Sequence, residues 1–249
     1  MDSNILKHDQ FPRSNKYDPI WIMKNQMGPH PLWLTEFLTQ PFDLKPGMRV
    51  LDLACGKGIT SVFLAKEFGV QVYAVDLWDA PDEKWENAKA HGMEHMITPI
   101  QADAKNLSFA PGFFDAIICV NSYMYFGQDE AYLENILKFL RPGGQIGFIM
   151  TSYAKEITDG IPNYIVEFLG ESQLWQWKTL SWWKNLWDKS NLAFIDAADT
   201  LPGGCALWLH WERVLLKYDP SVEDETDIFE EDLENGEYMG FIRLVATKK

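Results

Sequence analysis

The sequence predicts an α/β fold in which a mostly parallel, doubly wound β-sheet is covered by helices on both faces. Between residues 45 and 150, apolar runs of strand length alternate with stretches of helical periodicity. The runs are continuously apolar, as expected for parallel strands that are buried on both faces. A chain of 249 residues is long enough to bury such a core as one unit.

The elements of this core follow one another in a regular order. Strands are expected at residues 49–53, 71–76, 96–101, 114–120 and 144–152. Helices are expected between them at residues 59–68, 82–91 and 129–140. Gly69, Gly92 and the turn Pro142-Gly143-Gly144 stand where these helices should end. We therefore assign residues 45–152 to the core of the fold.

The first 44 residues do not share this alternation and are expected to form an N-terminal cap segment. Pro31 suits the first position of a short helix, which must end before Pro41. Residues 17–30 are predicted to be a loop, yet they carry apolar side chains such as Trp21 and Met27. Apolar residues in an irregular leader predict a segment that folds back over the core.

The chain after residue 152 is rich in tryptophan, with seven of its eleven tryptophans between residues 175 and 211. We expect a lid insertion at residues 153–219, with helices at 162–170, 173–188 and 205–217 and a sixth strand at 192–197. Residues 220–249 then supply an acidic segment and a last strand at 238–247, after the turn signal Asn235-Gly236. The tryptophan rings either form the core of the lid or line a pocket, where they would attract a cation.

Charge and cysteine content narrow the classes of function. The chain has 36 acidic and 22 basic residues, and ten of the acidic ones lie between Tyr218 and Ile242, where no Lys or Arg occurs. Such a balance disfavours nucleic acids as partners, because they are bound mainly through Lys and Arg. Cys55, Cys119 and Cys205 lack metal-ligand spacing, so we expect reduced packing thiols and no metal. The sequence does not indicate an oligomeric state.

No part of the sequence has the pattern of a membrane span or a signal peptide. It contains no run of about 18 apolar residues. The first residues also lack the basic-then-apolar order of a secretion signal. We therefore expect a cytoplasmic protein that does not insert into membranes.

The stretch from Val50 to Gly58 predicts a ligand site. A buried strand runs into a glycine turn and then a helix, and Asp76 follows twenty residues after Gly56. Because glycine has no Cβ, such a turn lets a nucleotide-like ligand approach the backbone closely. A nicotinamide dinucleotide would require glycine at positions 54, 56 and 59, and the chain has Ala54 and Ile59.

These features resemble the class I S-adenosylmethionine-dependent methyltransferases of the small-molecule branch. Asp52 to Gly58 matches the family's acidic and glycine-rich turn, with Ala54 in place of the first glycine. Val75-Asp76, Ala102-Asp103-Ala104 and the segments 114–118 and 140–144 match later motifs in the same order. The resemblance implies a Rossmann-like seven-stranded sheet with a reversed last strand, and S-adenosyl-L-methionine as cofactor.

The resemblance also implies which residues bind that cofactor: Asp52, Ala54, Cys55, Gly56, Gly58, Asp76, Leu77, Asp103, Ala104 and Asn121. Asp76 would accept hydrogen bonds from the ribose hydroxyls, and Asp103 or its neighbour would meet the adenine amino group. The helix that begins near Gly58 would point its amides at the methionine carboxylate, and Asp52 would take the ammonium. Taken singly, each Asp has a purely structural alternative as a turn cap, strand end or helix cap.

Catalytic residues are less constrained, because in-line methyl transfer mainly requires alignment and exclusion of water. Tyr123 and Tyr125, in the loop after the fourth strand, are predicted to face the substrate. His30 and His210 are candidate general bases. We expect methyl transfer to a small molecule, and aromatic content with net negative charge favours an amine. The alternatives are methyl or methylene transfer to a lipid, or a module that binds the cofactor or a partner without catalysis.

Overall fold

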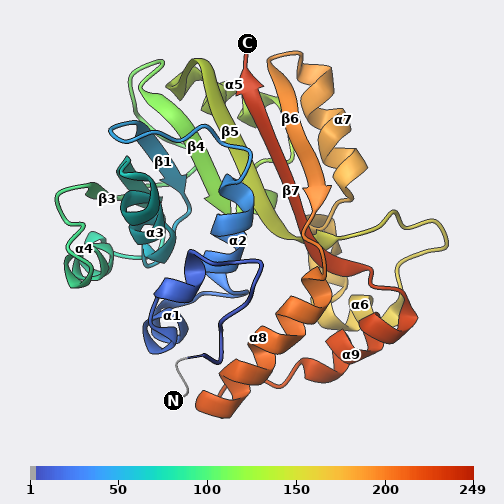
Figure 1. Ribbon diagram of the computed structural model, residues 1–249. Helices are drawn as coiled ribbons and strands as arrows, with labels where there is room; N and C mark the ends of the chain where they lie inside the picture. Colours follow the sequence, from blue (N-terminus) through green and yellow to red (C-terminus); the bar gives the residue numbers. More distant parts are fainter. Residues whose placement is uncertain (1–3) are drawn as a thin grey trace.

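The computed structural model describes residues 4–249 and contains one seven-stranded sheet with strand order β3-β2-β1-β4-β5-β7-β6. The strands pair in parallel from β3 to β5, whereas β7 runs antiparallel to both β5 and β6 (Figure 1). This confirms the predicted sheet and its reversed last strand. The strands are β1 Arg49–Leu53, β2 Gln71–Asp76, β3 Ile97–Gln101, β4 Phe114–Val120, β5 Leu140–Tyr153, β6 Ala193–Thr200 and β7 Met239–Lys248.

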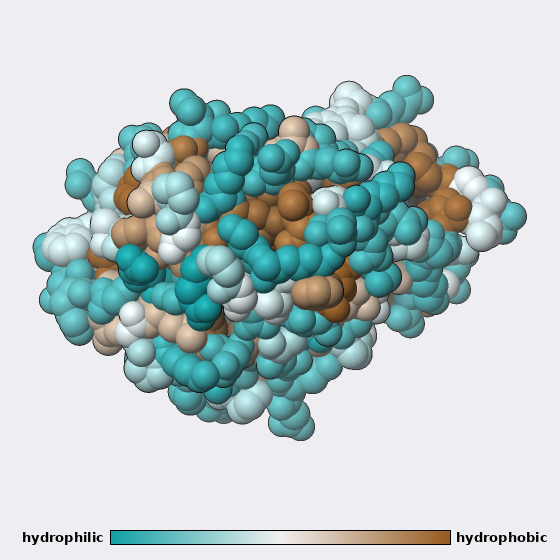
Figure 2. Space-filling model, turned by 90° about the horizontal axis from the view of Figure 1, so that it is seen from above, coloured by the Kyte–Doolittle hydropathy of each residue, from teal (hydrophilic) through white to brown (hydrophobic). Residues whose placement is uncertain are grey.

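Strand β1 lies between β2 and β4, so the winding of the chain reverses at this strand. In doubly wound sheets the crevice for a ligand lies beside such a reversal, at the carboxyl ends of the strands. The reversed strand β7 ends at the top of Figure 1, so the carboxyl ends of the parallel strands face the bottom, near α1, α2 and α8. Figure 2 looks onto the opposite edge, which is mostly hydrophilic with apolar residues visible between the polar ones.

The two faces of the sheet bury separate apolar cores. Val50 and Val72 face one core, which also contains residues of α2, α3 and α8. Leu51 and Leu53 point to the other face, where α5 and α7 pack. The helices are α1 Pro19–Asn25, α2 Pro31–Thr39, α3 Ile59–Phe68, α4 Pro81–Ala90, α5 Glu130–Phe139, α6 Asn163–Leu169, α7 Leu180–Ser190, α8 Gly204–Tyr218 and α9 Thr226–Asn235.

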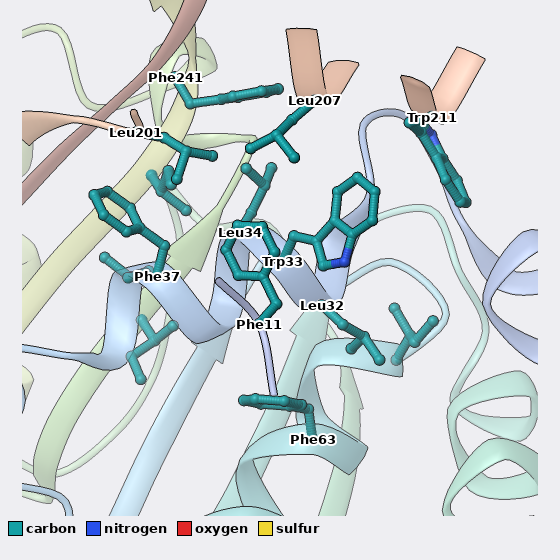
Figure 3. Close-up of a cluster of buried hydrophobic side chains, with 14 of the residues drawn as sticks. Phe11, Leu32, Trp33, Leu34, Phe37, Phe63, Leu201, Leu207, Trp211 and Phe241 are labelled. Carbon is teal, nitrogen blue, oxygen red and sulfur yellow. The ribbon is translucent and has the colours of Figure 1, made fainter. Parts of the chain in front are cut away.

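Helix α2 links the N-terminal segment to the core. All nine of its residues are buried, and its polar side chains Thr35, Glu36 and Thr39 make hydrogen bonds inside the protein. Figure 3 shows its side chains Leu32, Leu34 and Phe37 among apolar residues from distant parts of the chain. Phe11 of the leader stacks on Trp33 with ring centroids 5.5 Å apart. The leader is therefore part of the folded core.

Three flanking segments differ from the prediction. Residues 17–30 are not entirely loop, because the Asp18 side chain accepts a hydrogen bond from the Ile20 amide and starts α1. The expected helix at 173–188 is divided into a 3₁₀ helix, η3 Glu171–Gln176, and α7, since Thr179 caps a new start. The acidic segment contains α9, in which buried Asp232 accepts hydrogen bonds from the Tyr164 hydroxyl and two backbone amides.

Candidate functional site

A cavity of about 430 Å³ lies at the carboxyl ends of β1, β2 and β4. Its wall is built by the turn after β1, the end of β2, the loops after β3 and β4, and the N-terminal segment. Eight of the ten residues predicted to bind the cofactor line it: Ala54, Cys55, Gly56, Asp76, Leu77, Asp103, Ala104 and Asn121. The other two, Asp52 and Gly58, are buried and do not line it. The fold thus brings residues from four separate segments to one place.

The turn after β1 presents bare backbone to the cavity. Ala54, Gly56 and Gly58 all have positive φ angles, of 56°, 52° and 79°. A Cβ added at Gly56 would lie only 2.6 Å from the Met27 sulfur. A side chain at this position would therefore press on the N-terminal segment. Ala54 adopts a left-handed conformation, which is uncommon for a residue with a Cβ. Such unusual backbone conformations cluster at binding sites.

The Asp76 carboxylate organises the turn. One oxygen accepts a hydrogen bond from the Gly56 amide at 2.8 Å, and the other accepts from the amides of Trp78 at 2.8 Å and Asp79 at 3.2 Å. These bonds fix the carboxylate at the end of β2, where it lines the cavity although it is largely buried. Each oxygen has two lone pairs, so one acceptor position remains for a hydroxyl donor from a ligand, on the oxygen that is bonded to the Gly56 amide.

Asp52 is fully buried beneath the turn. One of its oxygens accepts hydrogen bonds of 2.6 Å from the hydroxyls of Thr60 and Ser61, while the other has no partner within the described part of the chain. Burial raises the pKa of this carboxyl to about 6, against the opposing effect of the two hydroxyls. Thr60 lines the cavity, so Asp52 reaches the site through that side chain.

The loop after β3 supplies Asp103 and Ala104. The Asp103 carboxylate accepts a hydrogen bond from the Lys105 amide at 2.8 Å, and the carbonyl oxygen of Ala104 accepts one from the Tyr132 hydroxyl at 3.2 Å. Asp103 is exposed, and its second carboxylate oxygen accepts no hydrogen bond from residues 4–249. The loop is thus held by its backbone while an acidic side chain faces the cavity mouth.

The loop after β4 separates the two predicted tyrosines. Asn121, with φ 55°, accepts a hydrogen bond from the Thr151 amide through its side chain at 3.0 Å and lines the cavity. Tyr125 also lines it and is 47% exposed. Tyr123 does not, because its buried ring stacks on Phe148 at 4.8 Å in the core on the other face. Burial raises the pKa of the Tyr123 hydroxyl well above its ordinary value.

Neither predicted histidine lines the cavity. The His30 ring is buried and stacks on Trp33 at 4.0 Å, and its Nδ1 accepts a hydrogen bond from the Trp33 amide. The proton of the neutral ring therefore lies on Nε2, and burial lowers the pKa of His30 to about 3. His210 is exposed, with a ring nitrogen 3.0 Å from the carbonyl oxygen of Ile5. These positions argue against either ring as a general base.

The N-terminal segment contributes a part of the wall that the motifs did not identify. Asn25, Met27, Pro29 and Pro31 line the cavity. The motifs also did not point to Trp78, which follows Leu77 on the rim and is 77% exposed. An indole this exposed is unusual. Its place on the rim follows from the fold and not from any local sequence pattern.

The tryptophan-rich segment packs in the core of the protein and does not line the cavity. Among the residues that the structure describes, none from 153–219 lines the cavity. Trp183 and Trp187 pack in the core beside Phe148, and Trp208 packs against Phe229. The buried Trp211 donates a hydrogen bond of 3.0 Å to the carbonyl oxygen of Gly28, next to the wall. These rings thus serve packing rather than the cavity lining.

A second cavity of about 250 Å³ lies at the opposite edge of the sheet, beside the ion pair between Arg141 and Asp115. None of the predicted site residues lies there. Over residues 4–249 no group of three or more His, Cys, Asp or Glu residues could hold a metal ion. The helices of the same range include none that is long and apolar enough to cross a membrane.

Comparison with known proteins agrees with the geometry of this site. Residues 50–144 match the family model described as a methyltransferase domain. The chain is 27% identical over 107 residues to a glycine/sarcosine/dimethylglycine N-methyltransferase of Actinopolyspora halophila, covering 43% of this chain and 19% of that protein. It is 38% identical over 108 residues to a ubiquinone biosynthesis O-methyltransferase of Xylella fastidiosa, covering 42% of each.

The fold also has solved counterparts. Phosphoethanolamine N-methyltransferase 2 of Haemonchus contortus, in complex with phosphomonomethylethanolamine and S-adenosylhomocysteine, superposes with a TM-score of 0.73. The sequences are 19% identical, and the match covers 99% of this chain and 60% of the other. The predicted methyltransferase domain and class I fold are thereby confirmed.

Proposed function

We propose that this chain, in which residues 50–144 form a methyltransferase domain, is an S-adenosylmethionine-dependent methyltransferase that acts on a small molecule. One observation carries the proposal. The carboxylate of Asp76 lies on the cavity wall and is bonded to the amide of Gly56, so an acidic acceptor and bare backbone meet at one point. A nucleoside with an adjacent charged tail suits this combination.

The residues of the cavity fit the cofactor. The free acceptor position of Asp76 is placed to take a hydrogen bond from a ribose hydroxyl, and Leu77 and Ala104 offer apolar contacts to the base. The Asp103 carboxylate is available to accept a hydrogen bond from the amino group of that base. Asp52, reached through Thr60, supplies a negative charge on the side of the ammonium. When bound, the cofactor supplies a methyl group activated by its positively charged sulfur.

The remaining part of the cavity is suited to an uncharged or cationic acceptor. Met27, Pro29, Tyr125 and Phe126 make this part apolar, and the amide of Asn121 is a polar group beside them. An amine that arrives without its proton needs no strong base, which agrees with the burial of His30 away from the wall. Tyr125 provides a hydroxyl that can hold the nitrogen and a ring face that attracts a cation. We therefore propose an amine as acceptor.

A labelled-cofactor screen tests this proposal. The purified chain is incubated with methyl-labelled S-adenosylmethionine and matched sets of amines, phenols, thiols, phosphorylated amines and fatty acids, and the product is identified by mass spectrometry. We expect turnover with neutral or cationic amines. Replacement of Tyr125 by Phe should reduce it about tenfold, the loss of one hydrogen bond of about 1.4 kcal/mol in the transition state.

Other outcomes of the screen separate the alternatives. Transfer to phenols or thiols alone would overturn the amine assignment and keep the methyltransferase. Transfer to fatty acids would favour the lipid alternative. Tight cofactor binding without transfer to any class would favour a module without catalysis. Absence of cofactor binding by calorimetry would contradict the proposed function itself.

A further inference from the structure

The N-terminal part of the cavity wall is attached to the core by side-chain hydrogen bonds from two helices. Trp211 of α8 bonds to the carbonyl oxygen of Gly28. On the other side, Asn87 of α4 contacts α1. Neither residue lines the cavity. The segment between these attachments contains Met27, whose sulfur lies over Gly56.

The Asn87 side chain joins three segments at once. Its amide nitrogen donates to the Asn25 side-chain oxygen at 2.9 Å and to the carbonyl oxygen of Lys57 at 2.8 Å. Its oxygen accepts a hydrogen bond from the Trp21 indole at 3.0 Å. Both hydrogens and the oxygen of this amide are engaged, and the residue is 9% exposed. A buried amide with every donor used specifies one arrangement of its neighbours.

Two of these partners belong to the cavity wall. Asn25 lies at the end of α1, and Lys57 lies within the turn that follows β1. They are 32 positions apart in the sequence, and in the described part of the chain they are joined through Asn87 and not by a hydrogen bond of their own. Asn87 therefore bridges the N-terminal segment and the glycine turn, on the side where Met27 covers Gly56.

We propose that Asn87 is a positioning residue for the cofactor: it fastens α1 and Met27 to the glycine turn, so that this side of the cavity is formed before the ligand arrives. The inference rests on the proposed function, because it concerns the same cavity. Preformed walls raise affinity by removing the cost of ordering a loop on binding.

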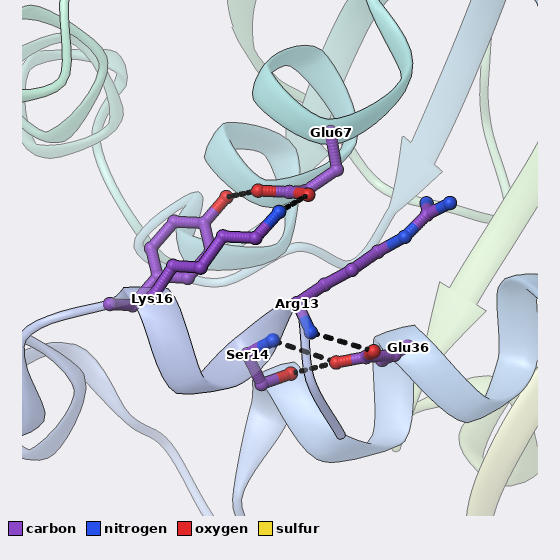
Figure 4. Close-up of polar contacts among 6 residues, drawn as sticks. Arg13, Ser14, Lys16, Glu36 and Glu67 are labelled. Atoms are coloured by element: carbon purple, nitrogen blue, oxygen red, sulfur yellow. Dashed lines mark hydrogen bonds and ion pairs between the residues drawn. The ribbon is translucent and has the colours of Figure 1, made fainter. Parts of the chain in front are cut away.

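The rest of the leader has attachments of its own, so loss of Asn87 should act locally. Figure 4 shows Glu36 of α2 accepting hydrogen bonds from the backbone amides of Arg13 and Ser14, at 2.9 and 2.7 Å. It also shows Lys16 paired with Glu67 at 2.7 Å. Trp21 retains its ring contact with His91 at 4.1 Å. We therefore expect residues 4–17 to stay docked when Asn87 is changed.

The test combines binding and hydrogen exchange in the full chain. Asn87→Leu removes the three hydrogen bonds at similar side-chain size. We expect S-adenosylhomocysteine to bind about tenfold more weakly by calorimetry, which corresponds to about 1.4 kcal/mol. Amide exchange in the ligand-free protein should become faster in peptides covering residues 18–30 and stay unchanged in peptides of β4 and β5. Tyr164→Phe, which removes a buried hydrogen bond to Asp232 far from the cavity, is the matched control and should leave the affinity unchanged.

A double-mutant cycle makes the assignment specific. Asn25→Ala alone should weaken binding less than Asn87→Leu, and the double variant should be no weaker than Asn87→Leu alone, because the two residues act through one contact. Additive effects, or normal affinity in both single variants, would overturn the inference. If Asn87→Leu does not fold, Asn25→Ala and Trp21→Phe carry the test. Failure of the unchanged protein to bind S-adenosylhomocysteine would contradict the proposed function instead.

Discussion

Replacement of Asp76 by Ala is expected to weaken S-adenosylmethionine binding by about 1.5–3 kcal/mol, or roughly 10- to 150-fold. The carboxylate is a charged acceptor on the cavity wall, and hydrogen bonds to charged groups are the stronger ones. The substitution also leaves the amides of Gly56, Trp78 and Asp79 without their acceptor, so the turn loses its support. Both effects act on the same ligand, which makes this the most damaging single change in the cavity.

Calorimetric titration with the cofactor and with its demethylated product measures this loss. Asp76→Asn keeps the size and one acceptor oxygen, and should recover part of the affinity. Asp79→Asn is the matched control, because it removes a neighbouring charge and keeps the backbone amide that bonds to Asp76. Unchanged affinity in Asp76→Ala would refute the ribose assignment. An equal loss in Asp79→Asn would show that the general negative field of the site matters more than the bond to Asp76.

The cofactor side of the cavity was predictable from the sequence because its signals are local. Ala54 to Gly58 form a turn whose backbone angles need small residues, and Asp76 stands at the end of a strand whose apolar pattern fixes its place. In a parallel sheet the ends of neighbouring strands meet at one edge, so residues twenty positions apart come together. The register of β1 with β2 pairs Leu53 with Val75, which brings this about.

The substrate side depends on contacts between segments far apart in the chain. Met27 and Pro29 lie between two attachments of the leader to distant helices: Asn87 bonds to Asn25, 62 positions away, and Trp211 bonds to Gly28, 183 positions away. No local pattern specifies such docking. Local sequence also does not predict how the short 3₁₀ turn η2 Tyr123–Tyr125 orients its side chains. It turns one tyrosine into the core and leaves the other on the cavity, and composition alone does not distinguish them.

Asp52 gives the second large expected effect, which is a dependence of stability on pH. The pKa of this carboxyl is raised from 3.8 to about 6 by burial, so between these values the folded state holds a proton that the unfolded state has released. The folded state is therefore favoured at low pH and loses stability as pH rises through this window. The difference amounts to about 3 kcal/mol, since each pKa unit is worth about 1.4 kcal/mol.

Urea unfolding at a series of pH values, with and without Asp52→Asn, isolates this contribution. The variant cannot ionise at this position, so its stability relative to the unchanged protein should increase by about 2 kcal/mol between pH 4 and 7, the part of the difference that falls in this range. Glu212→Gln is the control, because burial raises the pKa of Glu212 to about 7 in α8, away from the cavity. Because the pKa of Glu212 is higher, the stability gain of Glu212→Gln should continue to grow above pH 6, whereas that of Asp52→Asn should level off. A constant difference between Asp52→Asn and the unchanged protein would show that Asp52 is already ionised at pH 4.

The ionisation of Asp52 should also make ligand affinity depend on pH. Ionised Asp52 attracts the positively charged S-adenosylmethionine more than the neutral demethylated product, so the ratio of their affinities should rise with pH across the same window. In Asp52→Asn that ratio should not change with pH. A pH-independent ratio in the unchanged protein would mean that Asp52 only supports the turn through Thr60 and Ser61. The buried charge would then serve the fold and have no part in recognising the cofactor.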